Sequence, residues 1–285
     1  MPSTTVKNKL LVFLNLDGWG ISLNTENNAI RKAQIPGFKN LVNNFPATVL
    51  EGWDFELSRT YRSMGCSCHP ESEVQSPISV AKIISQFNLR QLRIASSSDF
   101  PLVSTFFNQS SSRLTGEDWL IVDNRRRLLK SFFNSNDLVD TLIKNIKSNS
   151  YNFIFSCISE IGQEVLKGDF LSVISAVENV SAYLDKIATA VLEVDGVLIV
   201  SSAYGGAEDV FNIGTGLANK KRTKNNVPLL IIGSNFMGKT IGLKEAPNND
   251  LSLLSPQGNY LKIAPSILKI LNLPLSSSMK EDSFI

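Results

Sequence analysis

The chain has 285 residues, of which 43% are hydrophobic and 19% are charged, and its formal net charge is +2. This composition suffices for one large core or two modest ones and excludes a disordered chain, while the small net charge argues against nucleic acid or an acidic membrane as the main partner. Three cysteines cannot complete a disulfide framework, the apolar runs are too short to span a membrane, and no N-terminal segment has the features of a signal peptide, so we expect a soluble, non-secreted protein of the cytoplasm or an organelle interior.

The first predicted element is a strand near the N-terminus. Residues Leu10 to Leu16 are apolar apart from Asn15, and the run stops at Asp17-Gly18-Trp19-Gly20. This pattern is typical of a strand that is buried on both faces and ends in a tight turn. Similar short runs predict further strands at residues 90–95, 119–122, 152–158, 196–201 and 228–232.

Helical patterns alternate with these runs. The clearest extends from Phe170 to Leu192, where apolar residues recur at spacings of three and four. Shorter amphipathic patterns predict helices from Asp137 to Ile146 and from Leu261 to Leu271, and Asn259 is placed to cap the second of these. The alternation predicts an α/β fold with a mostly parallel sheet that is covered by helices on both faces.

Four stretches, taken in order, resemble a known family. They are Leu16-Asp-Gly-Trp-Gly-Ile-Ser22, Leu89-Arg-Gln-Leu-Arg-Ile-Ala95, Gly168-Asp-Phe170, and Tyr204-Gly-Gly-Ala-Glu208 with the later Ile263-Ala-Pro-Ser-Ile-Leu268. Together they are similar to cofactor-independent phosphoglycerate mutase, a member of the alkaline phosphatase superfamily, and L-D-G-W-G is a specific signal. The resemblance implies a single alkaline-phosphatase-like domain over residues 1–285, with the ancestral site at the carboxyl ends of the strands.

The resemblance also implies that one part of the family is missing. In the family a second domain, which grips phosphoglycerate with arginines, is inserted between the nucleophilic serine and the segment that returns to the first domain. Here only about twenty residues separate Ser67 from Arg90, too few for a domain. We therefore expect the inserted domain to be absent between about residues 72 and 88.

The family's two-metal site can be traced onto this chain by the same resemblance. Asp17 keeps the first aspartate, and an ungapped count from it places Ser67 on the nucleophilic serine; Ser72 matches the serine only with an insertion. The other positions differ: Gly162 and Ala203 replace aspartates, Leu166, Tyr204 and Arg222 replace histidines, and Asp99 replaces a lysine. Because the chain has a single histidine, His69, the site cannot be rebuilt as the family builds it, and we expect no metal cofactor.

Given this resemblance, Asp17 has two possible roles. It is either a surviving metal ligand or a structural carboxylate at the end of a buried strand. In the second case Arg222 is placed to supply the positive charge that the lost metals no longer supply. Other carboxylates near the lost positions form an alternative set of ligands for a hard cation: Glu160, Glu164, Asp169, Glu208 and Asp209.

Two further groups of residues have a functional and an ordinary interpretation. Cys66-Ser-Cys-His69 offers at most three zinc ligands at an unusual spacing, which favours a structural role. Two basic clusters could bind phosphate, nucleic acid or an acidic partner, although such runs of basic residues usually lie in a solvated loop. Their basic residues are Arg125, Arg126, Arg127, Lys220, Lys221, Arg222 and Lys224.

These features favour a catalytically inactive pseudoenzyme that acts as a structural, accessory or regulatory subunit with a protein partner. The alternative is a residual metal-dependent phosphohydrolase or mutase-like enzyme that uses Ser67 and Asp17, and a third reading is binding of a phosphorylated metabolite without turnover. A scaffold should fill the old cleft with side chains such as Leu166 and Tyr204, and should expose an apolar patch. An enzyme should instead group at least four metal-binding atoms around Asp17 and Ser67.

Overall fold

A computed structural model describes residues 9–53, 56–69, 71, 78–107, 112–122, 135–279 and 281–285. Its centre is a seven-stranded sheet with the order β2-β7-β6-β1-β5-β3-β4. The strands are β1 (Leu11–Leu16), β2 (Ala47–Leu50), β3 (Gln91–Ser96), β4 (Glu117–Val122), β5 (Phe153–Ile158), β6 (Val197–Ser201) and β7 (Val227–Gly233).

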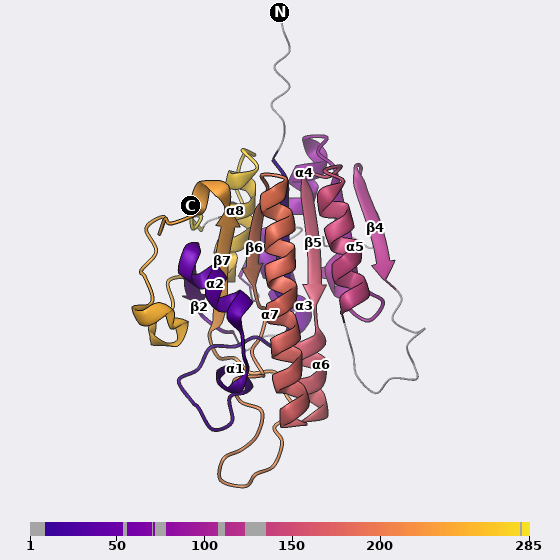
Figure 1. Ribbon diagram of the computed structural model, residues 1–285. Coiled ribbons are helices and arrows are strands. Elements are labelled where there is room, and N and C mark those ends of the chain that lie inside the picture. Colours follow the sequence, from indigo (N-terminus) through magenta and orange to yellow (C-terminus); the bar gives the residue numbers. More distant parts are fainter. Residues whose placement is uncertain are drawn as a thin grey trace, which may run out of the picture.

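The sheet is mostly parallel, as the alternation of elements predicted. β1 pairs in parallel with both β5 and β6, and β3 pairs in parallel with β4 and β5. The exception is β7, which runs antiparallel to β6 and to β2. As a result the carboxyl ends of β1, β3, β5 and β6 lie at one edge of the sheet, the lower edge in Figure 1.

Helices cover both faces of this sheet (Figure 1). One layer holds α1 (Ala29–Lys32), α2 (Pro36–Asn44), α5 (Asn136–Lys147), α6 (Glu160–Lys167) and α7 (Phe170–Glu193). The other holds α3 (Leu57–Cys66), α4 (Val80–Gln86), a π-helical turn over Leu102–Phe106, and α8 (Ile263–Ile270). Short 3-10 turns span Ser234–Phe236, Pro247–Asn249, Leu251–Leu253 and Tyr260–Lys262.

The apolar pattern of β1 explains why the sheet sits between two layers. Successive side chains of a strand point to opposite faces, so Val12 and Leu14 enter the core under α7 while Leu11 and Phe13 enter the core under α3 and α8. All of β1 is buried. In α7, residues such as Val177, Leu184 and Val191 at the predicted spacings are fully buried against the sheet.

The start of the C-terminal helix differs from the sequence expectation, and one helix was not predicted. The C-terminal helix begins as a 3-10 turn at Tyr260–Lys262, where the Asn259 side chain accepts a hydrogen bond from the Leu261 amide, and becomes α-helical at Ile263. Between α3 and β3 the described part of the chain contains α4. Among the described residues, no helix is both long enough and apolar enough to cross a membrane.

Candidate functional site

Asp17 lies where the ends of three strands meet. It follows β1 directly, and its backbone amide donates to the carbonyl of Ile158 at the end of β5, at 3.0 Å. The next amide, Gly18, donates to the carbonyl of Tyr204 beyond β6, at 3.1 Å. The Asp17 side chain is only 4% exposed, so its carboxylate has lost most of its water and requires a partner inside the protein.

Arg222 is that partner. Its Nε donates to Asp17 Oδ1 at 3.0 Å and its Nη2 donates to Oδ2 at 2.6 Å, a bidentate pair that engages both carboxylate oxygens. The hydrogen bond and charge of Asp17 hold the pKa of Arg222 above its ordinary value. The ion pair predicted between these two residues is confirmed, and Arg222 stands at a position that the family resemblance gives to a metal ligand.

Gly162, in the first turns of α6, packs directly on Asp17. Its amide donates to the Asp17 carbonyl at 3.0 Å, and a Cβ at this position would lie 2.4 Å from Asp17 Oδ2. Gly18, with φ of +98°, approaches the same amide so closely that its own Cβ would lie 2.8 Å away. In this arrangement α6 meets Asp17 through its backbone, and a side chain at residue 162 would require the Asp17 carboxylate to move.

Tyr204 and Ala203 are buried beyond the end of β6, whereas Leu166 is not. The hydroxyl of Tyr204 shares a hydrogen bond of 2.6 Å with Thr60 Oγ1 of α3, and the carbonyl of Ala203 accepts from Tyr260 at 2.8 Å. Leu166 is 40% exposed on α6. Tyr204 thus fills space at the strand ends as expected, but the expectation that Leu166 does so is wrong, because α6 turns that side chain outward.

A neutral polar cluster lies under the same strand ends and was not anticipated from the sequence. Asn15 Nδ2 donates to the Tyr61 hydroxyl at 2.7 Å and to Cys157 Sγ at 3.3 Å, and Tyr61 lies 3.2 Å from Cys157. Burial raises the pKa of both Tyr61 and Cys157, so both stay protonated. The one available signal was Asn15, the single polar residue in an otherwise apolar strand.

Asp99 is the second carboxylate at this edge of the sheet. Ser96 Oγ and Ser159 Oγ donate to its Oδ2 at 2.7 and 2.6 Å. Burial raises its pKa, the two serine hydrogen bonds oppose that shift, and the nearby charges of Asp17 and Arg222 act on it in opposite directions. Asp99 is therefore held by hydroxyl groups, while the guanidinium of Arg222 goes to Asp17.

Ser67 does not face this cluster through any described contact. It caps the C-terminal end of α3 with φ of 54°, and its buried Oγ has no hydrogen-bond partner among the described residues. Thr60, which touches Tyr204, lies seven residues earlier, a rise of about 10 Å along the helix. The neighbouring thiols donate to backbone carbonyls, Cys66 to Arg62 and Cys68 to Cys66.

The remaining carboxylates that the sequence singled out have separate partners. Among the described residues, no group of three or more His, Cys, Asp or Glu side chains is arranged to hold a metal ion. Glu160 accepts from Asn179 and the Ser135 amide, Glu164 pairs with Lys167, Asp169 accepts from Ser172, Asp209 accepts from Asn27, and Glu208 accepts from Gly206, Thr223 and Asn225.

Only one of the two basic clusters lies within the part of the chain that the structure describes. Lys220, Lys221 and Lys224 are exposed on the loop that carries Arg222, and Arg222 itself turns inward to Asp17. Arg125, Arg126 and Arg127 lie outside the described residues, so a patch that joins both clusters stays a prediction.

Exposed apolar side chains gather beside this loop, where α6 meets α7. Leu166 and Leu171 are 40% and 71% exposed, and Ile213 and Leu217 on the facing loop are 54% and 70% exposed. The two segments touch, because the rings of Phe170 and Phe211 meet edge to face at 5.3 Å. We call these exposed residues, Leu166, Leu171, Ile213 and Leu217, the corner patch.

Comparison with known sequences identifies the family. A family model described as the metalloenzyme superfamily matches residues 9–275. The 2,3-bisphosphoglycerate-independent phosphoglycerate mutases of Chloroflexus aurantiacus and Thermomicrobium roseum are 30% and 28% identical over 76% and 73% of this chain. Each match covers 38% of the relative, so the chain spans less than half the length of these curated proteins.

Comparison with solved structures shows the same fold. A crystal structure of Leishmania mexicana phosphoglycerate mutase at low cobalt concentration superposes with a TM-score of 0.76 at 11% identity, over 99% of this chain and 98% of that chain. Alkaline phosphatase from the Antarctic bacterium TAB5 gives a TM-score of 0.55 at 12% identity, over 94% of this chain and 98% of that one. The alkaline-phosphatase-like fold predicted from the sequence is confirmed.

Proposed function

This chain belongs to the metalloenzyme superfamily, and we propose that within it the chain is a catalytically inactive, phosphoglycerate-mutase-like protein that serves as a structural or regulatory subunit of a larger assembly. The observation that carries the proposal is the bidentate pair of Arg222 with Asp17. A guanidinium occupies both oxygens of the one aspartate that matches a family metal ligand.

The residues around Asp17 do not fit the metals that the family name implies. A cation bound to Asp17 would have to displace Arg222 and tolerate its positive charge nearby. Gly162, at a ligand position, has its backbone against Asp17 Oδ2 and offers no donor side chain. Tyr204, at another, has its hydroxyl hydrogen-bonded to Thr60 of α3. We therefore derive no catalytic step through a metal at this site.

The corner patch supports a role in binding a protein. Leu171 and Leu217 are about two thirds exposed or more, and water contact with such large apolar side chains is unfavourable unless a partner covers them. Lys220 and Lys221 are exposed on the same loop as Leu217. We expect the partner to present apolar side chains bordered by carboxylates.

Metal content and turnover test the first half of the proposal. The purified chain is dialysed against manganese, magnesium or zinc and assayed for bound metal and for hydrolysis of p-nitrophenyl phosphate and conversion of phosphoglycerate, with the Chloroflexus aurantiacus mutase as positive control. We expect no stoichiometric metal and no turnover above buffer. Stoichiometric metal with turnover that Ser67→Ala abolishes would overturn the proposal in favour of a residual phosphohydrolase.

The second half is tested on the corner patch. Leu171→Ser and Leu217→Ser together should release the partner that co-purifies with the native chain, without lowering the melting temperature. Leu275→Ser, at a 50% exposed leucine outside the patch, is the matched control and should retain the partner. A partner that stays bound to the patch variant and is lost from the control would place the interface elsewhere and contradict this assignment.

A further inference from the structure

A cavity of about 500 Å³ lies away from the strand-end cluster, between α1, α2, the segment after β1 and residues 248–252. Asp17, Tyr204 and Arg222 do not line it. Its volume is within the range of about 300–1,000 Å³ that small-molecule sites occupy. The proposed function makes no use of this cavity.

The inner wall of the cavity is aromatic and apolar. Trp19 and Phe38 line it, and their rings stack with centroids 4.5 Å apart. Ile35 and Leu251, 7% and 4% exposed, extend the same wall. Because the two rings are almost fully buried, the apolar surface that a ligand can reach includes the partly exposed Ile21 and Ile30, and it favours an apolar body.

An unpaired donor belongs to this wall. Trp19 is fully buried, and its Nε1 has no hydrogen-bond partner among the described residues. A buried donor without an acceptor costs about 1–3 kcal/mol, so most indole N–H groups in protein interiors have a partner. This atom has almost no accessible surface, so it lies behind the wall and takes no part in the contact with a ligand.

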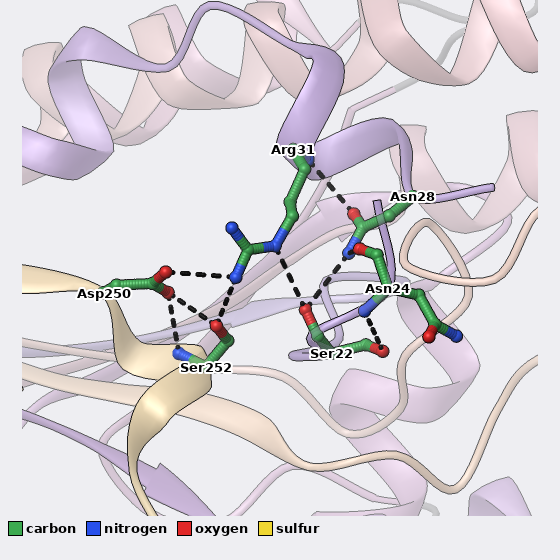
Figure 2. A network of polar contacts seen from close by, with 6 residues as sticks. All are labelled: Ser22, Asn24, Asn28, Arg31, Asp250 and Ser252. Atoms are coloured by element: carbon green, nitrogen blue, oxygen red, sulfur yellow. Dashed lines mark hydrogen bonds and ion pairs between the residues drawn. The ribbon is translucent and has the colours of Figure 1, made fainter. Parts of the chain in front are cut away.

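Arg31 forms the rim and is held in place by residues from two segments, the one after β1 and residues 250–252 (Figure 2). Its Nη2 donates to Asp250 Oδ2 at 3.0 Å and to Ser252 Oγ at 2.5 Å, and its Nε donates to the carbonyl of Ser22 at 3.4 Å. Its Nη1 makes no hydrogen bond with the described residues. The guanidinium is therefore positioned without being saturated, which keeps donors available at the mouth of the cavity.

The charge of the lining is positive. Arg31 and Lys39 contribute two cations, and Asp250 is the single carboxylate among the lining residues. Asp250 is already paired with Arg31, while Lys39 is exposed on α2 and forms no ion pair with the described residues. The unmet charge at the mouth therefore favours an anionic group.

From these features we propose that the cavity binds a small molecule that has an apolar body and one anionic group. The partly exposed side chains of Ile21 and Ile30 contact the apolar body, and Lys39 together with Arg31 Nη1 holds the anion at the mouth. A neutral compound of the same shape contacts the apolar wall but gains nothing from the two cations. This difference between a charged and an uncharged ligand of equal shape makes the proposal testable.

The test uses 1-anilinonaphthalene-8-sulfonate and its uncharged counterpart N-phenyl-1-naphthylamine in fluorescence titrations of the whole chain. Lys39→Glu replaces a surface cation that has no ion pair with the described residues, and it should raise the dissociation constant of the sulfonate about tenfold, as expected for a change of about 1.4 kcal/mol. The same variant should change binding of the neutral probe less than about twofold. Lys32→Glu, an equal charge change on α1 outside the lining, is the control and should leave both probes within about twofold.

A second variant places the probe in the cavity. Ile35→Trp fills the space beside Trp19 and should weaken both probes more than tenfold while Lys39→Glu affects only the anion. If Lys39→Glu and Lys32→Glu weaken the sulfonate equally, the effect is one of net charge and the proposal is wrong. It is also wrong if sulfonate binding is unaffected by Lys39→Glu but lost from the Leu171→Ser and Leu217→Ser variant of the corner patch.

Discussion

Two arginines of this protein turn their guanidinium groups toward buried carboxylates, and the two pairs are built differently. Arg222 approaches Asp17 from a loop at the strand ends, and its side chain keeps 28% of its surface exposed. Arg93 projects from β3, with its Nε 3.0 Å from Glu117 Oε1 of β4, and both side chains are fully buried. The first pair lies at the strand ends, while the second lies inside the core.

The surroundings of Arg93 show what full burial of a cation requires. Its Nη2 donates to Gln91 at 2.8 Å, and its guanidinium lies 5.2 Å from the ring centroid of Phe153 and 5.4 Å from that of Phe107. Burial lowers the pKa of Arg93 to about 10, although Glu117 opposes the shift. Aromatic faces and a carboxylate together offset the lost hydration.

The difference teaches that a buried ion pair is not in itself a trace of function. Arg93 and Glu117 are diagonal neighbours on adjacent strands. The register places Gln91 opposite Glu117 and Arg93 opposite Trp119, two residues further along. Asp17 and Arg222 join segments far apart in the chain at the strand ends. What distinguishes the Asp17–Arg222 pair is therefore its place at the strand ends. Experiments should measure how much each pair stabilises the fold.

The largest expected effect follows from breaking the core pair. Arg93→Met leaves Glu117 buried without its cation, and we expect the free energy of unfolding to fall by about 3–5 kcal/mol in urea denaturation. Arg90→Met, directly before the same strand, is the matched control, because the Arg90–Asp118 pair is about half exposed and should contribute less than about 1 kcal/mol. Adding Glu117→Gln to Arg93→Met should recover part of the loss; if it deepens the loss, the charge of Glu117 is not the cause.

A smaller effect is expected at the strand ends. Arg222→Met leaves Asp17 without its bidentate partner, but water can reach the position that Arg222 vacates, so we expect a loss of about 2–3 kcal/mol in the free energy of unfolding. Asp17→Asn in the same chain should restore most of it, and the exposed neighbour Lys221→Met should change it by less than about 0.5 kcal/mol. A stable Arg222→Met variant that binds a divalent ion stoichiometrically would mean that Asp17 remains a metal ligand.

The fold was accessible from sequence where apolar runs are long and unbroken. The runs that end at Asp17 and Ile158 became β1 and β5, and the long pattern after Gly168 became α7. Shorter elements escaped. β2 is a four-residue strand and α1 is a four-residue helix, too short for a clear pattern. α6 contains Gly162, and a glycine weakens a helical pattern. In the structure this glycine lets the backbone of α6 contact Asp17.

The site was only partly accessible. The pairing of Asp17 with Arg222 followed from a charge argument, since a buried carboxylate demands a cation and the family resemblance placed Arg222 where a metal ligand was expected. Tyr61 and Cys157 could not be foreseen, because nothing in their spacing places them beside Asn15; only the packing of α3 on the sheet does so. The cavity beside Trp19 likewise depends on the approach of residues 248–252 to α1, which no local pattern encodes.

The smallest expected effect concerns Glu208, a third buried carboxylate that sharpens the comparison because its partners are neutral. It is fully buried and accepts from the Gly206 amide at 2.6 Å, from Asn225 Nδ2 at 3.0 Å and from Thr223 Oγ1. Burial raises its pKa, and the hydrogen bonds only partly oppose that shift.

Because the pKa of Glu208 is higher in the folded chain than in the unfolded one, the folded state holds its proton to higher pH. Its contribution to stability is therefore greatest below the unfolded pKa, near the ordinary value for glutamate, and declines as the pH rises toward the folded pKa. Glu208→Gln should flatten the fall of unfolding free energy above pH 5, while Glu193→Gln, at a half-exposed carboxylate paired with Lys147, should not. Melting curves measured across this pH range test the prediction. If the free energy of unfolding falls equally with pH for wild type and Glu208→Gln, the Glu208 carboxylate is ionised in the core without a cation, unlike Asp17 and Glu117.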